Sequence, residues 1–133
     1  MATFVRFETP YHCDSSRQCL GIFWAAAAVE ERADLPEWTR EWLNNRSYWF
    51  GAHLPIPRRD SIDRRAIFWF RPQSKIVREV WHLVAILREE GVPVALRRTN
   101  LPGRIIYDDD VQVAAIPYGH GRRLRRQKLL RLI

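Results

Sequence analysis

The segment that most constrains the fold is residues 74–91, SKIVREVWHLVAILREEG. At 100° per residue its apolar side chains fall on one arc of about 160°, and Arg78, Glu79 and Glu89 fall outside that arc. The apolar members are Ile76, Val77, Val80, Trp81, Leu83, Val84 and Leu87. Gly91 and Pro93 then form a strong stop signal. The pattern predicts an amphipathic helix over 74–90, whose apolar face must be covered by a second layer.

The residues that follow this helix predict three strands separated by two turns. Segments 92–98, 104–107 and 111–116 are rich in β-branched and apolar residues. The intervening positions hold Pro102 and Gly103 and then three consecutive aspartates, which are favoured in turns. Because the turns are short, we expect an antiparallel meander packed on the 74–90 helix.

The N-terminal half predicts one strand and two helices. Residues 3–8, TFVRFE, alternate as a strand does, and Pro10 is expected to end it. Segments 15–33 and 34–55 each open with a capping-type spacing and continue with helix-compatible residues. Residues 67–70, IFWF, are too few to assign by period, so either a short strand or a helical turn fits.

These elements predict an α+β fold in a single domain over residues 1–118. The expected sheet has about four strands, mainly antiparallel, formed by the N-terminal strand and the C-terminal β-meander and packed against three helices. A chain of 133 residues can bury a sufficient core without a disulfide or a metal ion. Residues 119–133 are expected to form a basic C-terminal tail outside this domain.

Charge is distributed unevenly between the domain and the tail. The tail holds six of the 22 Lys and Arg residues and none of the 15 Asp and Glu residues, which leaves the domain with a net charge of +1. The cations of the tail are Arg122, Arg123, Arg125, Arg126, Lys128 and Arg131. They could neutralise up to six phosphates, so nucleic acid or an acidic protein is the most natural partner.

Two other roles for the tail stay open. It could be a solvated segment without a specific partner, or its leucines could dock on the surface of the domain. As a helix, its apolar residues would spread over about 240°, which is unlike a membrane-surface helix. The longest apolar run, 19–29, is also shorter than the roughly 20 residues that span a bilayer. With no secretory signal visible, we expect a cytoplasmic protein that does not bind membranes and has reduced thiols.

Three residues near the N-terminus could carry chemistry, namely His12, Cys13 and Cys19. Five residues separate the two cysteines, whereas zinc sites usually have two to four, so neither a metal nor another cofactor is expected. Cys19 is expected to be a small buried side chain on the 15–33 helix. Cys13 precedes that helix, and a helix dipole lowers a thiol pKa. This position supports an alternative hypothesis, a small enzyme with its site near His12 and Cys13.

Two further clusters favour structural roles. Asp108, Asp109 and Asp110 could bind Mg²⁺, but aspartate in a strand-to-strand turn usually bonds the local backbone. Trp38, Trp42 and Trp49 share one helix face within about 40°. Such a stripe is usually core, and we expect burial of the first two tryptophans and a groove beside the third.

The hypothesis that best fits the sequence is a small non-enzymatic binding or accessory protein. Its basic tail would contact nucleic acid or an acidic partner, because the uneven charge is the least random feature of the chain. Six Trp, six Phe and four Tyr exceed what a small core needs, which leaves an exposed aromatic patch and a homodimer open.

Overall fold

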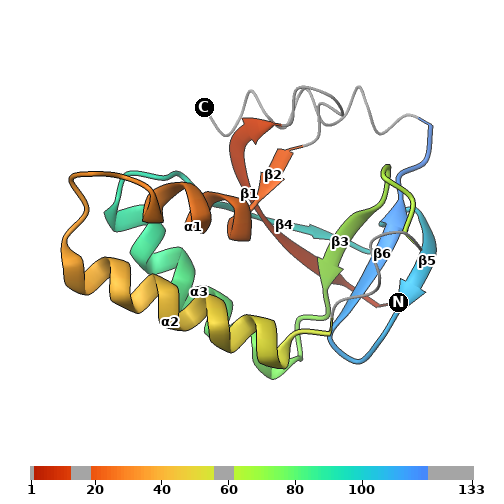
Figure 1. Ribbon diagram of the computed structural model, residues 1–133. Helices are drawn as coiled ribbons and strands as arrows, with labels where there is room; N and C mark the ends of the chain where they lie inside the picture. The colour runs from red at the N-terminus through yellow and green to blue at the C-terminus, as the bar shows by residue number, and fades with distance from the viewer. Residues whose placement is uncertain (1, 13–18, 56–61, 120–133) are drawn as a thin grey trace.

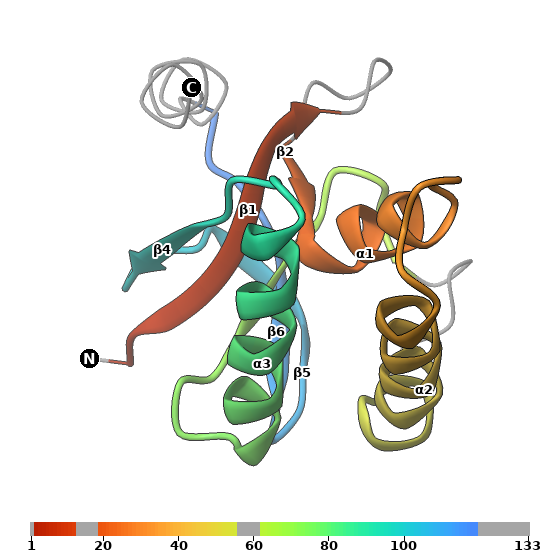
Figure 2. The same ribbon diagram turned by 90° about the vertical axis from the view of Figure 1, so that its left-hand side faces the viewer.

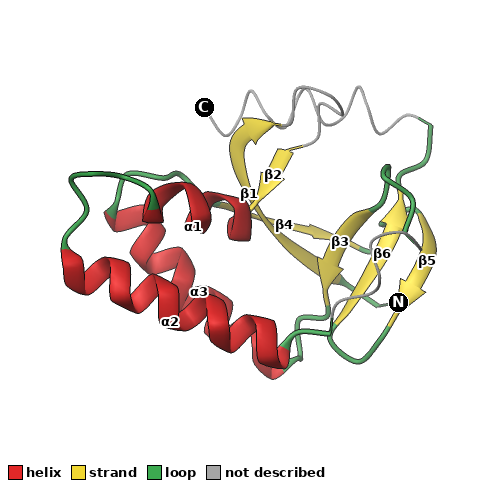
Figure 3. Ribbon diagram, in the orientation of Figure 1, coloured by secondary structure: helices red, strands yellow, loops and turns green. Residues whose placement is uncertain are grey.

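The computed structural model describes residues 2–12, 19–55 and 62–119, shown in colour in Figure 1. Within them the chain forms six strands and three helices in an α+β fold. The strands are β1 (Phe4–His12), β2 (Cys19–Gly21), β3 (Ile67–Phe70), β4 (Ala95–Thr99), β5 (Arg104–Asp108) and β6 (Gln112–Ile116). The helices are α1 (Ile22–Glu30), α2 (Glu37–His53) and α3 (Lys75–Glu89), and they gather on one side of the sheet (Figure 3).

The long strand β1 organises the sheet. The strand order is β2-β1-β3-β6-β5, with β4 also paired to β1, and every pairing is antiparallel. Val5 and Glu8 each pair with β4, and they also pair with β3 and β2 respectively. A strand has only two edges, so β2 and β3 must share the edge of β1 opposite β4.

The expected helix over 74–90 is confirmed as α3, and its apolar arc forms most of the main core. Ile76, Val77, Val80, Leu83, Val84 and Leu87 are all buried there, against Val5, Phe7 and Phe70 of the sheet. Trp81 is an exception to the expected burial, since it is 40% exposed. Its ring lies at the edge of the core and meets the Phe7 ring edge-on, with centroids 4.9 Å apart.

The predicted meander is wrong in one of its pairings. The turn between β5 and β6 does join an antiparallel hairpin, but β4 pairs with β1 along Phe4–Thr99 to Glu8–Ala95 rather than with β5 (Figure 2). The physical reason is that the turn chemistry at Pro102 and Gly103 specifies a change of direction, whereas the edge of β1 offers β4 five paired residues. The sheet thus has six strands where about four were expected.

The N-terminal half differs from expectation at two boundaries. β1 continues through Pro10 to His12, because Pro10 falls where the β1–β2 register is irregular and no regular ladder bond is lost. The first helix begins at Ile22 instead of residue 15, since residues 19–21 pair with β1 as β2. The predicted cap at Ser15 and Gln18 lies outside the described residues. Residues 67–70, left open by the sequence, form β3.

A smaller cluster lies apart from the main core. It consists of Phe4, Ile67, Trp69 and Val113. These residues alternate with Val5 and Phe70, so they occupy the opposite face of the sheet from the helices. None of the helices in the described ranges is long and apolar enough to cross a membrane.

Candidate functional site

The six cations of the tail, from Arg122 to Arg131, lie outside the described residues, and so does the tail itself beyond Gly119. The role expected for them is therefore still a prediction. What the structure does describe is how the arginines of the domain are used.

Most arginines of the domain are held by acceptors within it. Arg32 Nη1 donates to the Glu90 carbonyl at 2.7 Å, and Arg40 Nη2 donates to the Arg32 carbonyl at 2.6 Å. These two contacts satisfy carbonyl groups just beyond the C-terminal ends of α3 and α1, where helices leave acceptors unpaired. Others form ion pairs, such as Arg46 with Glu79 at 2.5 Å. These arginines thus help to hold the fold together.

The residues proposed for a thiol site are only partly described. Cys13 lies outside the described residues, and Cys19 is in β2, so its expected place on a helix is wrong. The β1–β2 register places His12 opposite Cys19. Across the described part of the chain, no group of three or more His, Cys, Asp or Glu residues is arranged to hold a metal ion.

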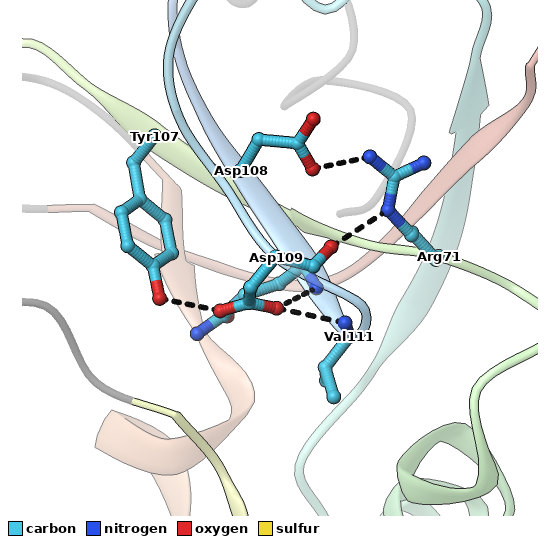
Figure 4. A network of polar contacts seen from close by, with 6 residues as sticks. Arg71, Tyr107, Asp108, Asp109 and Val111 are labelled. Atoms are coloured by element: carbon cyan, nitrogen blue, oxygen red, sulfur yellow. Dashed lines mark hydrogen bonds and ion pairs between the residues drawn. The ribbon is translucent and has the colours of Figure 1, made fainter.

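The aspartate run stabilises the β5–β6 turn, as expected (Figure 4). Asp109 Oδ1 accepts from the backbone N–H groups of Val111 at 2.7 Å and Gln112 at 2.9 Å. Its other oxygen accepts from the Tyr107 hydroxyl at 2.5 Å, and this bond raises the tyrosine pKa above its ordinary value. Asp108 accepts from Arg71, whose Nε also donates to the Asp109 carbonyl at 2.9 Å. Two of the three carboxylates are therefore engaged, that of Asp109 with the local backbone and that of Asp108 with the distant Arg71.

The tryptophan stripe of α2 is not core as a whole. Trp38 is 63% exposed, which contradicts the expected burial, while Trp42 and Trp49 are only partly buried. The helix buries Thr39, Leu43 and Phe50, a face rotated by one residue, or about 100°, from the stripe. The stripe therefore flanks the core. Trp49 stacks on His53 with ring centroids 4.3 Å apart and lines neither of the two cavities described next.

A cavity of about 330 Å³ opens where β1 changes partners. Its lining residues are Arg6, Phe7, Gly21, Ile22, Phe23, Trp24, Leu54, Phe68, Phe70 and Gln112. β3 pairs with β1 at Val5 and β2 pairs with it at Glu8, so the neighbouring strand changes over Arg6 and Phe7. The Arg6 guanidinium lies at the point where the neighbour of β1 changes from β3 to β2. Its Nη1 donates to the Phe68 carbonyl of β3 at 3.0 Å.

Gly21 brings β2 close to the same guanidinium. A Cβ added to Gly21 would lie 3.8 Å from Arg6 Nη2 and 4.0 Å from the Phe7 carbonyl oxygen. Arg6 thus lies between the two strands that share one edge of β1, and it forms the charged end of an otherwise mainly apolar cavity.

Arg6 belongs to a buried group of three charges. Glu8 is only 1% exposed, and its two oxygens accept from Arg6 Nε at 2.9 Å and Arg97 Nη1 at 2.8 Å. The two arginine side chains are 14% and 16% exposed. Arg97 also lies over the Trp69 ring, 5.6 Å from its centroid. The three side chains place charge in a poorly solvated region, where electrostatic interactions are screened less than at the surface.

The remaining walls of the cavity are largely aromatic. Phe23 meets Phe70 edge-on with centroids 6.4 Å apart, and Trp24 contacts the Tyr11 ring at 5.8 Å. Phe23, Trp24 and Tyr11 are all exposed, so they form an open aromatic rim. At another wall, Gln112 Nε2 donates to the Pro55 carbonyl at 2.6 Å, which orients that amide.

A second cavity, of about 340 Å³, lies between α1 and α2. It shares Phe23 and Leu54 with the first cavity. Its polar lining residues are Glu30, Arg46 and Ser47. Arg46 is already paired with Glu79 and Glu30 is acidic, so the described lining of this cavity has no excess of positive charge.

Sequence reasoning did not identify the Arg6 cavity. One signal was present: Arg6 and Glu8 alternate with Val5 and Phe7, which predicts two charges on one face of a strand. The other walls come from β2, α1, β3 and β6, whose meeting has no local signature.

Comparisons of the chain with protein-family models, with curated proteins and with solved structures found no match. The site is therefore interpreted from its own chemistry.

Proposed function

We propose that the protein is a non-enzymatic binding protein whose basic tail contacts nucleic acid. The observation that carries the proposal is the distribution of charge: six cations and no anion in residues 119–133, against a domain of net charge +1. Six clustered cations attract phosphate backbones by counterion release, a mechanism that needs no folded interface.

The contacts of the domain arginines support this difference in role between the domain and the tail. Arg32, Arg40 and Arg88 donate to backbone carbonyls, and Arg46 and Arg71 pair with carboxylates. These five side chains are bonded within the domain, whereas the tail adds six cations with no anion among them. An acidic protein is a second partner of the same charge, and the experiment separates the two.

The test is an electrophoretic mobility shift with the full chain at several salt concentrations. Six phosphate contacts predict a log–log slope of about −5 on duplex DNA or about −4 on a single strand. Binding should be largely indifferent to base sequence, because backbone contacts carry no base information. A variant with all six cations changed to Gln should lose binding and keep its melting temperature.

A matched variant, Leu129→Ala with Leu130→Ala, keeps every charge and should bind as the parent does. If these changes instead lower the melting temperature, the tail docks on the domain. A full chain that gives no shift even near 50 mM salt contradicts the proposal, because such arms bind well at that salt concentration. Binding to polyglutamate and not to DNA would identify an acidic protein as the partner.

The second hypothesis is a small enzyme that uses His12 and a nearby cysteine. The observation in its favour is the β1–β2 register, which sets His12 opposite Cys19. An activated thiol would be alkylated with a pKa well below the usual value of about 8.5. Comparing Cys13→Ser with Cys19→Ser would show which thiol reacts, and ordinary pKa values for both would refute this hypothesis.

A further inference from the structure

The Arg6 cavity has the size and composition of a small-molecule site. Its volume of about 330 Å³ lies within the range of ligand pockets, roughly 300–1,000 Å³, although near its lower end. Such pockets combine apolar walls with a few oriented polar groups. Here the polar groups are the Arg6 guanidinium, held by Glu8 and the Phe68 carbonyl, and the Gln112 amide, held by the Pro55 carbonyl. Both are oriented by the fold before any ligand arrives.

The walls select for a flat, apolar ligand. Phe7, Phe23, Trp24, Phe68 and Phe70 all line the cavity, and aromatic rings prefer offset or edge-to-face contact with other rings. Phe23 and Trp24 are also exposed at the rim, where the free protein leaves apolar surface in water. A ligand ring that covered them would remove that surface from water, which is favourable.

The charge selects for an anion. The aromatic faces alone would also attract a cation, but the positively charged Arg6 guanidinium lines the cavity and would repel a cation at this end. A guanidinium carries five N–H groups and can serve more than one acceptor at once, so Arg6 can keep its bond to Glu8 while it contacts a ligand. A carboxylate or sulfonate at this end would be attracted to the positively charged guanidinium.

We propose that the cavity between β1, β2, β3 and α1 binds a small aromatic anion of one or two fused rings. The rings lie against the phenylalanine and tryptophan walls, and the acid group faces Arg6. The residues named for this site do not belong to the basic tail, and the proposal does not depend on the function proposed for the tail.

The first test measures affinity by isothermal titration calorimetry with the full chain and three probes of similar shape. The probes are 2-naphthoate, its neutral amide 2-naphthamide, and the cation 2-naphthylmethylammonium. A charge-assisted contact predicts that the amide binds at least about tenfold more weakly than the carboxylate, and that the cation binds most weakly. Octanoate, an aliphatic anion, should also bind more weakly because it cannot match the ring contacts.

The second test locates the site with paired glycine variants. Gly21 has an extended backbone, with φ −81° and ψ 177°, and the nearest atom to an added Cβ is 3.8 Å away. Gly21→Leu should therefore fold and fill the cavity, which abolishes 2-naphthoate binding. Gly51, which lines the cavity between α1 and α2, is the matched control. Gly51→Leu should leave binding unchanged.

Three more variants test for other causes of a change in binding. Trp24→Ala removes a wall and should weaken binding, while Trp38→Ala removes another exposed tryptophan, from α2, and should not. The variant with its six tail cations changed to Gln should bind 2-naphthoate as the parent does. Loss of binding in that variant would assign the anion to the tail and overturn the proposal.

The proposal is also overturned if 2-naphthoate does not bind at millimolar concentration or if the amide binds as tightly as the carboxylate. Equal binding of octanoate would refute the aromatic preference. If Gly51→Leu abolishes binding and Gly21→Leu does not, the ligand occupies the other cavity and the proposal is wrong. The melting temperature of each variant is measured as a check on folding. If a variant does not fold, the comparison of probes on the unmodified chain still tests the proposal.

Discussion

The charge group of Glu8, Arg6 and Arg97 yields a quantitative prediction about stability. Glu8→Gln keeps the size of the side chain but removes the carboxylate that both guanidinium groups bond, at 2.9 and 2.8 Å. Removing one partner from a buried ion pair costs about 3–5 kcal/mol, because the remaining charges stay buried without their counter-charge. Since the two arginines are 14% and 16% exposed, water relieves part of that cost. We expect the free energy of unfolding to fall by about 3 kcal/mol, the lower end of this range.

The assay is urea unfolding followed by circular dichroism, with Glu37→Gln as the matched control. Glu37 also pairs with an arginine, Arg40, at 3.2 Å, but its side chain is highly exposed. Exposed pairs contribute about 0–1 kcal/mol, so the control should shift little. With a slope of about 2 kcal/mol per molar urea, Glu8→Gln should lower the midpoint by roughly 1.5 M.

A double-mutant comparison checks the cause. If the cost arises from unpaired guanidinium groups, adding Arg97→Gln to Glu8→Gln should destabilise the protein much less than Arg97→Gln alone does. A midpoint for Glu8→Gln no lower than that of Glu37→Gln would refute the reasoning, and so would fully additive losses in the double variant.

Three other predictions come from single features of the fold. Leu87 is fully buried on α3, so Leu87→Ala should cost about 2–5 kcal/mol in urea unfolding, and an unchanged midpoint would mean that this face is not core. Gly103 has φ +123°, and an added Cβ would lie 2.1 Å from the Ile116 carbonyl oxygen, so Gly103→Ala should lower the melting temperature clearly; an unchanged value would contradict this contact. Arg65 lowers the pKa of Asp63 from 3.8 to about 2 through a hydrogen bond, so any stability from this pair is present above pH 4 and is lost as the pH falls toward 2. Carboxylate NMR titration should show Asp63 returning toward 3.8 in Arg65→Gln, and an unmoved titration would contradict the assignment.

Features that depend on neighbours in the chain could be predicted from the sequence. The apolar period of residues 74–90 predicted α3 and its buried arc, because that period indicates which side of a helix faces the core. The aspartate run predicted the β5–β6 turn, because the carboxylate of Asp109 accepts hydrogen bonds from N–H groups two and three residues away. The charge imbalance between domain and tail is likewise a property of composition alone, and the function proposed from it needs no fold.

Features that depend on distant segments could not be predicted in this way. Residues 19–21 have a helix-compatible context but form β2, because pairing with β1 outweighs local preference. Strand β4 pairs with β1 and not with the nearby β5 for the same reason. Trp38 is exposed because α2 packs a neighbouring face against the core.

The Arg6 cavity belongs wholly to the tertiary structure. The sequence determined that Arg6 and Glu8 share a face of β1, since side chains alternate along a strand. Only the fold decided that Arg97 would join them, that β2 and β3 would meet the same edge of β1, and that Phe23 and Trp24 would line the gap. Contacts of this kind join residues up to 89 positions apart, and they form because burial and pairing are satisfied across the whole chain, for which no local pattern carries the information.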